Sequence, residues 1–165
     1  MEFKNPLLNQ TPERLKKLQA NFFSSIPHAR ELGIEVTDIG PARGTLKIPY
    51  RDVLIGDPRT GIIHGGVITS LIDSSCGLAV FAALPRMEAI ATLDLRIDYM
   101  KPAQPKLDIY AFSECYKLTR QIAFVRSIAY QDDINDPVAT SVSAFMRASS
   151  KLPPITPKQF KSEMG

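Results

Sequence analysis

One uninterrupted apolar stretch limits the folds open to this chain more than any other feature of its sequence. From Gly65 to about Leu84 there is no proline, the apolar residues are too dense for one face of a strand, and Pro85 ends the segment. The pattern predicts one long helix over residues 65–84. Because the carboxylate of Asp73 and several hydroxyls would be costly in lipid, we expect this helix in the core of a soluble protein.

Alternating apolar and polar residues around this segment predict strands. Residues 33–50 contain two short β-like runs separated by a Gly-Pro turn, which favours a hairpin. Residues 91–100 place Leu93 on an apolar face and Thr92 on a polar face, as in a half-buried strand. Three further β-like runs with short connections favour an antiparallel meander. They cover residues 106–118, 121–131 and 137–148.

Together these elements predict an α+β domain in which a sheet of about six antiparallel strands covers one long helix. With 165 residues, 44% of them hydrophobic, the chain fits a single domain over residues 1–165. We expect the core at about 28–149, an amphipathic helix within 1–27 and a proline-containing tail at 150–165. The sheet face away from the helix would expose an apolar patch, so self-association is expected.

Composition and charge argue against several classes of partner. The 20 Lys and Arg residues are scattered among 17 Asp and Glu residues, without the basic block typical of nucleic-acid binding. The first residues lack the apolar core of a secretory signal, so we expect a cytoplasmic protein without a membrane partner. Cys76 and Cys115 match no zinc or redox spacing and are expected to be buried thiols. Two histidines without clustered ligands predict neither a metal nor another cofactor.

The tripeptide His64-Gly65-Gly66 opens the predicted helix and could carry chemistry. Paired glycines let the backbone bend tightly, and the free N–H groups of a first helical turn can bind an anion or an oxyanion. A plain helix start that tolerates glycine as a cap explains the same residues. His64 could polarise a carbonyl, orient the glycine loop or fill space. The sequence lacks the GK[ST] and GxGxxG patterns of phosphate loops and the GxSxG turn of serine hydrolases.

A lone carboxylate, Asp73, follows Gly65 by eight residues on the predicted helix. It is either a buried acid bonded to a nearby hydroxyl, from Ser70, Ser74 or Thr92, or a catalytic base in a partly buried site. A helix rises about 1.5 Å per residue, so Asp73 and Gly65 lie about 12 Å apart and cannot act on one carbonyl. A second, antiparallel copy of the helix could unite them across a two-fold axis, which predicts an active site shared between subunits.

The segment HGGVITSLID, followed by ATLDLRIDYMKPA, resembles the hotdog-fold thioesterases, specifically the PaaI-like acyl-CoA thioesterases. The family pattern is HGG followed by an acidic residue nine positions after the histidine, and His64 and Asp73 have this spacing. The resemblance covers about residues 33–148. It implies an antiparallel sheet wrapped around the long helix, dimers or dimer-based tetramers, and hydrolysis of acyl-CoA thioesters without a metal.

The resemblance also implies roles for individual residues. The amide of Gly65, and with it that of Gly66, would polarise the thioester carbonyl, while Asp73 of the partner subunit would act as base or nucleophile. Thr92 matches a position where relatives place a hydroxyl that helps to position the attacking water. Many relatives have an asparagine a few residues before HGG, and in this chain that partner is either missing or replaced by Asp57.

Charged side chains could meet the phosphorylated nucleotide of a CoA substrate, or could be solvated surface charges. The candidates are Lys117, Arg120, Arg126 and Arg147. Two other functions stay open beside thioester hydrolysis. One is a hotdog hydratase or dehydratase that acts on an enoyl or 3-hydroxyacyl thioester, and the other is a non-catalytic acyl-CoA-binding module.

Overall fold

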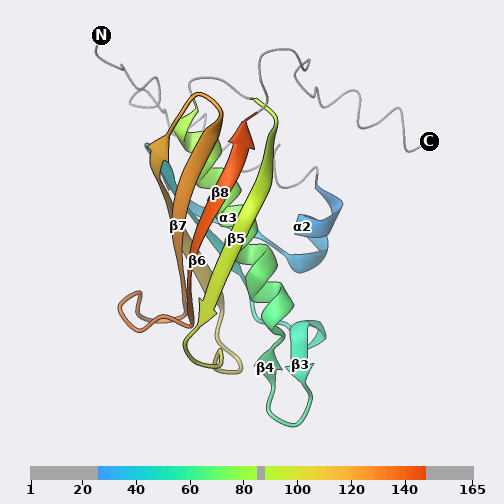
Figure 1. The fold of residues 1–165 in the computed structure, drawn as a ribbon. Helices are drawn as coiled ribbons and strands as arrows, with labels where there is room; N and C mark the ends of the chain where they lie inside the picture. Colours follow the sequence, from blue (N-terminus) through green and yellow to red (C-terminus); the bar gives the residue numbers. More distant parts are fainter. Residues whose placement is uncertain (1–25, 85–87, 148–165) are drawn as a thin grey trace, which may run out of the picture.

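One long helix, α3, lies across one face of a six-stranded antiparallel sheet in the computed structural model, which describes residues 26–84 and 88–147 (Figure 1). The strand order across the sheet is β1-β2-β6-β7-β8-β5. The strands are β1 (Glu35–Gly40), β2 (Arg43–Ile48), β5 (Ile90–Tyr99), β6 (Ile109–Leu118), β7 (Ile122–Tyr130) and β8 (Ala139–Arg147). The predicted α+β class is confirmed. The amphipathic helix and the tail predicted near the two ends fall outside the described residues, apart from Ile26.

The helix α3 spans Gly65–Ala83, as predicted, and supplies the centre of the core. Ten of its nineteen residues are buried, and Leu71 and Ile72 are fully enclosed where the helix packs against β2 and β6. The backbone becomes extended at Leu84 and the helix ends there. By length and composition α3 could cross a membrane. Burial within the chain's own core accounts for its apolar composition equally well.

The predicted hairpin is formed by β1 and β2, which pair antiparallel. A short helix that was not predicted, α2 (Pro27–Leu32), precedes it. Proline opens this helix, and Gly33 ends it in a left-handed conformation with φ of 68°, donating its N–H to the carbonyl of Arg30. Proline at the start and glycine just past the end are ordinary helix boundaries, so the sequence held the signals for α2.

The strand β5 corrects two predictions about the sheet. It pairs with β8 and not with β6, because α3 crosses the sheet and delivers the chain to the far edge. The last four strands are therefore not a simple meander. A bulge places Thr92 opposite Phe145 and Asp94 opposite Ala144, which leaves Leu93 as the extra residue. The alternation of inward and outward side chains shifts by one residue at this bulge. Thr92 therefore faces α3, whereas Leu93 is 55% exposed.

Serine hydroxyls cluster between the middle of α3 and the central strands. Ser113 on β6 is fully buried, and its Oγ lies 2.8 Å from Ser75 Oγ on α3 and 2.9 Å from Ser127 Oγ on β7. The hydroxyls of Ser75 and Ser127 donate to backbone carbonyls, so Ser113 can donate to either of them. Ser141, the neighbour of Ser127 on β8, is also buried, but its Oγ has no partner among the described residues.

This difference predicts opposite results for two identical substitutions. Ser113→Ala should lower the free energy of unfolding by about 1 kcal/mol, because it removes a buried hydrogen bond. Ser141→Ala, the matched control, should leave that free energy unchanged or raise it, because the hydroxyl it removes is buried and unpaired. Equilibrium unfolding in urea measures both variants. Equal destabilisation by the two substitutions would contradict the assignment of these hydrogen bonds.

Both cysteines are buried and free, as predicted. Burial raises the pKa of the Cys76 thiol, and burial raises that of Cys115 to about 11. At pH 8 only about one Cys115 in a thousand would then be a thiolate. We expect both thiols to resist a thiol-specific reagent at pH 8 until the protein is unfolded. The change in absorbance with and without denaturant measures this, and rapid labelling of the folded protein would show that the thiols are accessible.

Candidate active site

The glycine turn, residues 64–66, is held by its own histidine. His64 has an extended backbone, with φ of −61° and ψ of 133°, and forms the N-cap of α3. Its Nδ1 accepts a hydrogen bond of 2.9 Å from the N–H of Gly66. A neutral imidazole that accepts at Nδ1 carries its proton on Nε2. His64 thus orients the turn, which is one of the three roles predicted for it. Its Nε2–H can donate a hydrogen bond to another group.

The two glycine amides differ in what they can do. The N–H of Gly66 is used by His64, whereas the N–H of Gly65 has no acceptor within the described parts of the chain. The unpaired amide lies at the start of a 19-residue helix, where the positive end of the helix dipole favours an anion. Gly65 is therefore the better candidate of the two for polarising a carbonyl oxygen.

Tyr99, at the end of β5, fixes the same turn from the other side. Its hydroxyl donates to the carbonyl of Gly65 at 2.8 Å and lies 2.8 Å from the hydroxyl of Thr69. Thr69 in turn donates to the carbonyl of Gly65 at 3.1 Å. The sequence alone does not predict this contact, because alternation indicates only that Tyr99 shares a face with the inward residues of β5. Tyr99 and Gly65 are 34 positions apart in the sequence, and this separation gives no sign of their proximity.

The hairpin before α3 packs tightly against the cap. It consists of β3 (Ile55–Asp57) and β4 (Ile62–Ile63), which sequence analysis did not predict. A Cβ added at Gly56 would lie only 2.8 Å from Cα of His64, so a side chain there would displace the cap. The N–H of His64 donates to the carbonyl of Leu54 at 2.9 Å. The glycine turn is thus braced by the hairpin as well as by Tyr99.

The carboxylate of Asp73 is half-buried on α3 and faces β5. Thr92 donates its hydroxyl to Oδ1 of Asp73 at 2.8 Å. Of the three hydroxyls proposed as partners, Thr92 is the one that binds, and the β5 bulge is what turns it toward the helix. The second carboxylate oxygen, Oδ2, has no hydrogen-bond partner in the described structure. Asp73 is therefore oriented by one oxygen and keeps the other for a further contact.

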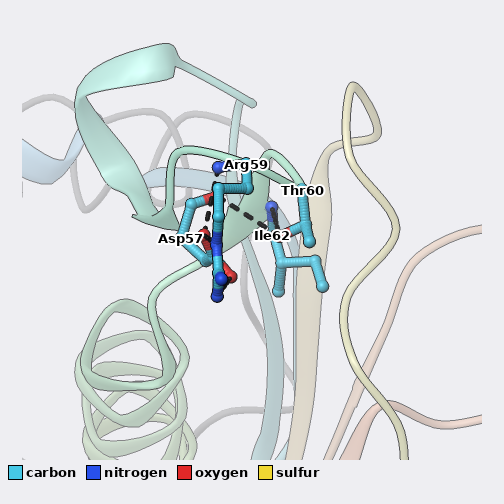
Figure 2. A network of polar contacts seen from close by, with 4 residues as sticks. All are labelled: Asp57, Arg59, Thr60 and Ile62. Carbon is cyan, nitrogen blue, oxygen red and sulfur yellow. Dashed lines mark hydrogen bonds and ion pairs between the residues drawn. The ribbon is translucent and has the colours of Figure 1, made fainter.

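Asp57 stabilises the turn between β3 and β4 through hydrogen bonds. Its Oδ1 accepts from the backbone N–H and from Nε of Arg59, both at 3.0 Å, and Oδ2 accepts from Nη2 at 2.9 Å. Figure 2 shows this network together with Thr60, whose hydroxyl accepts from the N–H of Ile62 at 3.4 Å. The hydrogen bonds from Arg59 lower the pKa of the Asp57 carboxyl. Contact of Asp57 with a substrate stays a prediction.

The four cations predicted to meet a nucleotide lie away from the glycine turn of the same chain. Arg147 pairs with Ile90 at the start of β5 and donates to the carbonyl of Thr119, next to Arg120. Tyr99 is nine residues further along β5, a distance of about 30 Å. Lys117 lies at the same end of the sheet as Arg147, and Arg126 is paired with Glu114 on the outer face.

Within residues 26–84 and 88–147 the structure contains no group of three or more His, Cys, Asp or Glu side chains that could hold a metal ion. Two groups with catalytic potential stand out among the described residues. They are the unpaired Gly65 amide and the half-buried Asp73 carboxylate, eight residues or about 12 Å apart along α3.

The architecture and the glycine turn match a known family. A model of the Thioesterase superfamily matches residues 60–138, which include the turn, α3 and β5. The medium/long-chain acyl-CoA thioesterase YigI of Escherichia coli is 30% identical over 105 residues, which are 56% of this chain and 68% of that protein. The chain therefore belongs to the thioesterase superfamily, and its fold is the hotdog fold. The predicted resemblance is confirmed at this level.

Other relatives cover different shares of the chain. YigI of Salmonella typhimurium is 28% identical over 134 residues, 73% of this chain and 86% of that protein. A Halobacterium salinarum protein provisionally named an esterase is 42% identical over 79 residues, which span 46% of this chain and about half, 52%, of that protein. A crystal structure of a Pseudomonas aeruginosa protein has 45% identity, a TM-score of 0.74, and coverage of 81% of this chain and 98% of that chain.

The structure of the PaaI protein from the phenylacetic acid degradation operon of E. coli shares the fold. It has 16% identity and a TM-score of 0.68, and the match covers 77% of this chain and 88% of that one.

Proposed function

We propose that this protein is an acyl-CoA thioesterase that hydrolyses its substrate to a free carboxylic acid and CoA, in an active site shared between two copies of the chain. The observation that carries the proposal is the pair of groups on α3. The Gly65 amide has no acceptor, and the Asp73 carboxylate has one oriented oxygen and one free oxygen. Membership of the thioesterase superfamily and the activity named for the YigI relatives support this reaction class.

The chemistry follows from where each group can act. The thioester carbonyl oxygen would accept the hydrogen bond of Gly65, and this bond would strengthen as negative charge develops on that oxygen. Asp73 of a second copy would then act in one of two ways. As a base, it removes a proton from water while the water oxygen bonds to the carbonyl carbon. As a nucleophile, Oδ2 attacks that carbon and forms an anhydride, which water hydrolyses. Both routes break the carbon–sulfur bond. The departing sulfur takes the proton held by Asp73 in the first route and a proton from water in the second, so CoA leaves as a thiol.

Thr92 has a positioning role in this scheme. Its hydrogen bond to Oδ1 fixes the carboxylate plane, which leaves Oδ2 to contact water or the substrate. His64 keeps the Gly66 amide bonded inside the turn and fixes the direction of the first peptide groups of the helix. Polarisation of the carbonyl by the imidazole Nε2–H stays a prediction.

Two surfaces support self-association of the chain. The free edge of β5 is ten residues long, and unpaired strand edges of this length are seldom left open to water. The outer face of the sheet exposes Tyr116, Val142 and Met146 by about half of their surface. We propose a homodimer, or a dimer of dimers, in which two copies of α3 run antiparallel. That arrangement would place Asp73 of one copy near Gly65 of the other.

The same arrangement would bring the distant cations toward the substrate. In antiparallel copies, the end of the sheet that carries Lys117, Arg120 and Arg147 would lie on the glycine-turn side of the other copy's site. The nucleotide phosphates of CoA would find positive charge from Lys117 and Arg120 there, whereas the guanidinium of Arg147 is already paired with Glu88 at 2.9 Å. Arg126, on the outer face, would contribute only if the nucleotide wraps around the sheet.

Measuring thiol release from a series of acyl-CoA substrates tests the proposal. Hydrolysis yields one free thiol and one carboxylic acid per turnover. A hydratase or dehydratase would change the acyl chain and leave the thioester intact, and a binding module would release no thiol even at high protein concentration. Absence of thiol release from short, medium, branched and aryl acyl-CoAs would refute the proposed function.

A further inference from the structure

The strand β5 lies at the edge of the sheet, and its side chains are divided between two faces (Figure 1). Among the described strands, β8 is its sole partner. Leu95 and Ile97 lie opposite the buried residues Ser143 and Ser141, and both pack against the core. These two side chains therefore face α3, and the residues that alternate with them point to the outer face.

Three charged side chains follow one another on the outer face of β5. They are Asp94, Arg96 and Asp98, and all three are exposed. Arg96 donates to Oδ1 of Asp98 from Nε at 3.3 Å and from Nη2 at 3.1 Å. The carboxylate of Asp94 has no ion pair within the described residues. The free edge thus presents one cation between two anions, and one of these anions is unpaired.

We infer that β5 pairs antiparallel with β5 of a second copy, in the register that places Leu95 opposite Leu95 of the partner subunit and Arg96 opposite Asp94 of the partner subunit. The inference rests on the proposed function, because a site shared between two copies needs both α3 helices on one side of a joined sheet. Inward residues must then lie opposite inward residues. A register shifted by one residue is excluded, because it places Leu95 opposite the outward Arg96.

The charges select among the registers that keep the faces matched. With Leu95 opposite itself, each Arg96 meets the unpaired Asp94 of the other copy and keeps Asp98 of its own chain. A shift of two residues brings like charges together, with Arg96 opposite Arg96 in one direction and Asp94 opposite Asp94 in the other. A shift of four residues pairs Arg96 with Asp98 of the other copy but leaves Asp94 without a partner.

The same register pairs the whole strand and suits the shared site. Four residues of β5 follow Leu95 and five precede it, one of which is the extra residue of the bulge. Leu95 is thus the midpoint, so both free edges are paired over their full length. Thr92, which binds Asp73, is then offset by only two residues, or about 7 Å along the strand, from the partner's Tyr99, which holds the glycine turn.

Two double variants of identical composition test this register. Arg96→Asp places like charges opposite each other at both symmetric contacts and should raise the Kd of the dimer about tenfold or more. Adding Asp94→Arg restores the attraction, so this double variant should return to within about threefold of the unmodified Kd. Adding Asp98→Arg instead keeps an ion pair within each chain but leaves two carboxylates opposite each other, so Kd should stay raised. Sedimentation velocity over a range of concentrations measures Kd.

A cysteine at the two-fold axis gives a second measurement. Leu95→Cys would place two thiols directly opposite each other, with their Cα atoms about 5 Å apart, which a disulfide can span. In Ile97→Cys, the matched control, the two thiols would lie four residues apart along the strands, or about 13 Å, which is too far. We expect mild oxidation to give a covalent dimer with Leu95→Cys alone on a non-reducing gel. The native cysteines are buried, and the unmodified protein controls for them.

Several results would overturn the register. They are recovery by Asp98→Arg in place of Asp94→Arg, a covalent dimer of Ile97→Cys, and charge variants that all assemble like the unmodified protein. Thermal unfolding establishes that each variant is folded, and if Leu95→Cys fails to fold, the charge variants decide, because their side chains are exposed. Asp94→Ala removes the attraction without adding a repulsion, so its dimer should persist.

Thiol release by the unmodified protein keeps the two proposals separate. An active enzyme whose charge variants do not follow this pattern refutes only the register. The expected pattern in a protein that releases no thiol from any acyl-CoA refutes only the proposed hydrolysis.

Discussion

Asp73→Ala is expected to lower kcat for thioester hydrolysis by about 10²- to 10⁴-fold, the usual contribution of a positioned acid–base group. The substitution removes the carboxylate that would activate water or attack the carbonyl. Because Asp73 is half-buried and its hydrogen bond comes from a single hydroxyl, the free energy of unfolding should change far less than the rate. Steady-state thiol release gives kcat, and thermal unfolding shows the effect on stability. The measured molecular mass shows whether the assembly is unchanged.

Two further variants sharpen the test of Asp73. Asp73→Asn keeps the size of the side chain and can still accept from Thr92, so a similar loss of kcat would assign the effect to the carboxylate charge. Asp94→Ala, two residues beyond Thr92 on the exposed side of β5, is the matched control and should retain nearly full activity. Retention of most activity by Asp73→Ala would refute the proposed mechanism.

Gly65→Pro is the second substitution with a large expected effect, because a ring carbon replaces the hydrogen of the Gly65 amide, which removes the donor and occupies the place of its acceptor. Proline is favoured at the first position of a helix, and the ψ of 133° at His64 suits a residue before proline. An added Cβ would lie 3.5 Å from the hydroxyl of Tyr99, an ordinary contact. The loss of the amide donor should lower kcat by about 10²- to 10³-fold. Gly65→Ala keeps the N–H and is the control.

Mixing the two inactive chains tests whether the site is shared. A mixed dimer of Gly65→Pro and Asp73→Ala contains one site with both groups intact and one site with both lost. Random assembly makes about half of the dimers mixed, so activity should return to about a quarter of the unmodified value. If both groups act within one chain, the mixture stays inactive. That result would reject the shared site while leaving the role of each residue in place.

Much of the fold could be predicted because the relevant signals are local. The absence of proline over residues 65–84 and the dense apolar residues specified α3, and alternation specified the strands. The pairing of strands was harder to predict than the strands themselves. The chain reaches β5 through α3, and the way this helix crosses the sheet decides that β5 pairs with β8. The sequence spacing between strands contains no information about that crossing.

The candidate site could be predicted only in part for a similar physical reason. The HGG turn and Asp73 are separated by a fixed helical distance, so their geometry follows from spacing alone. The bulge that turns Thr92 toward Asp73 comes from pairing with β8, and simple alternation places that side chain on the wrong face. The contact between Tyr99 and Gly65 likewise depends on tertiary packing.

The hydrogen bond from Gly66 to His64 leaves the glycine turn one amide, that of Gly65, to offer to a ligand oxygen. A single donor fixes the distance of that oxygen but lets the group that carries it rotate about the contact. The face of the carbonyl that meets the attacking group would therefore be selected by the walls of the site and not by the turn.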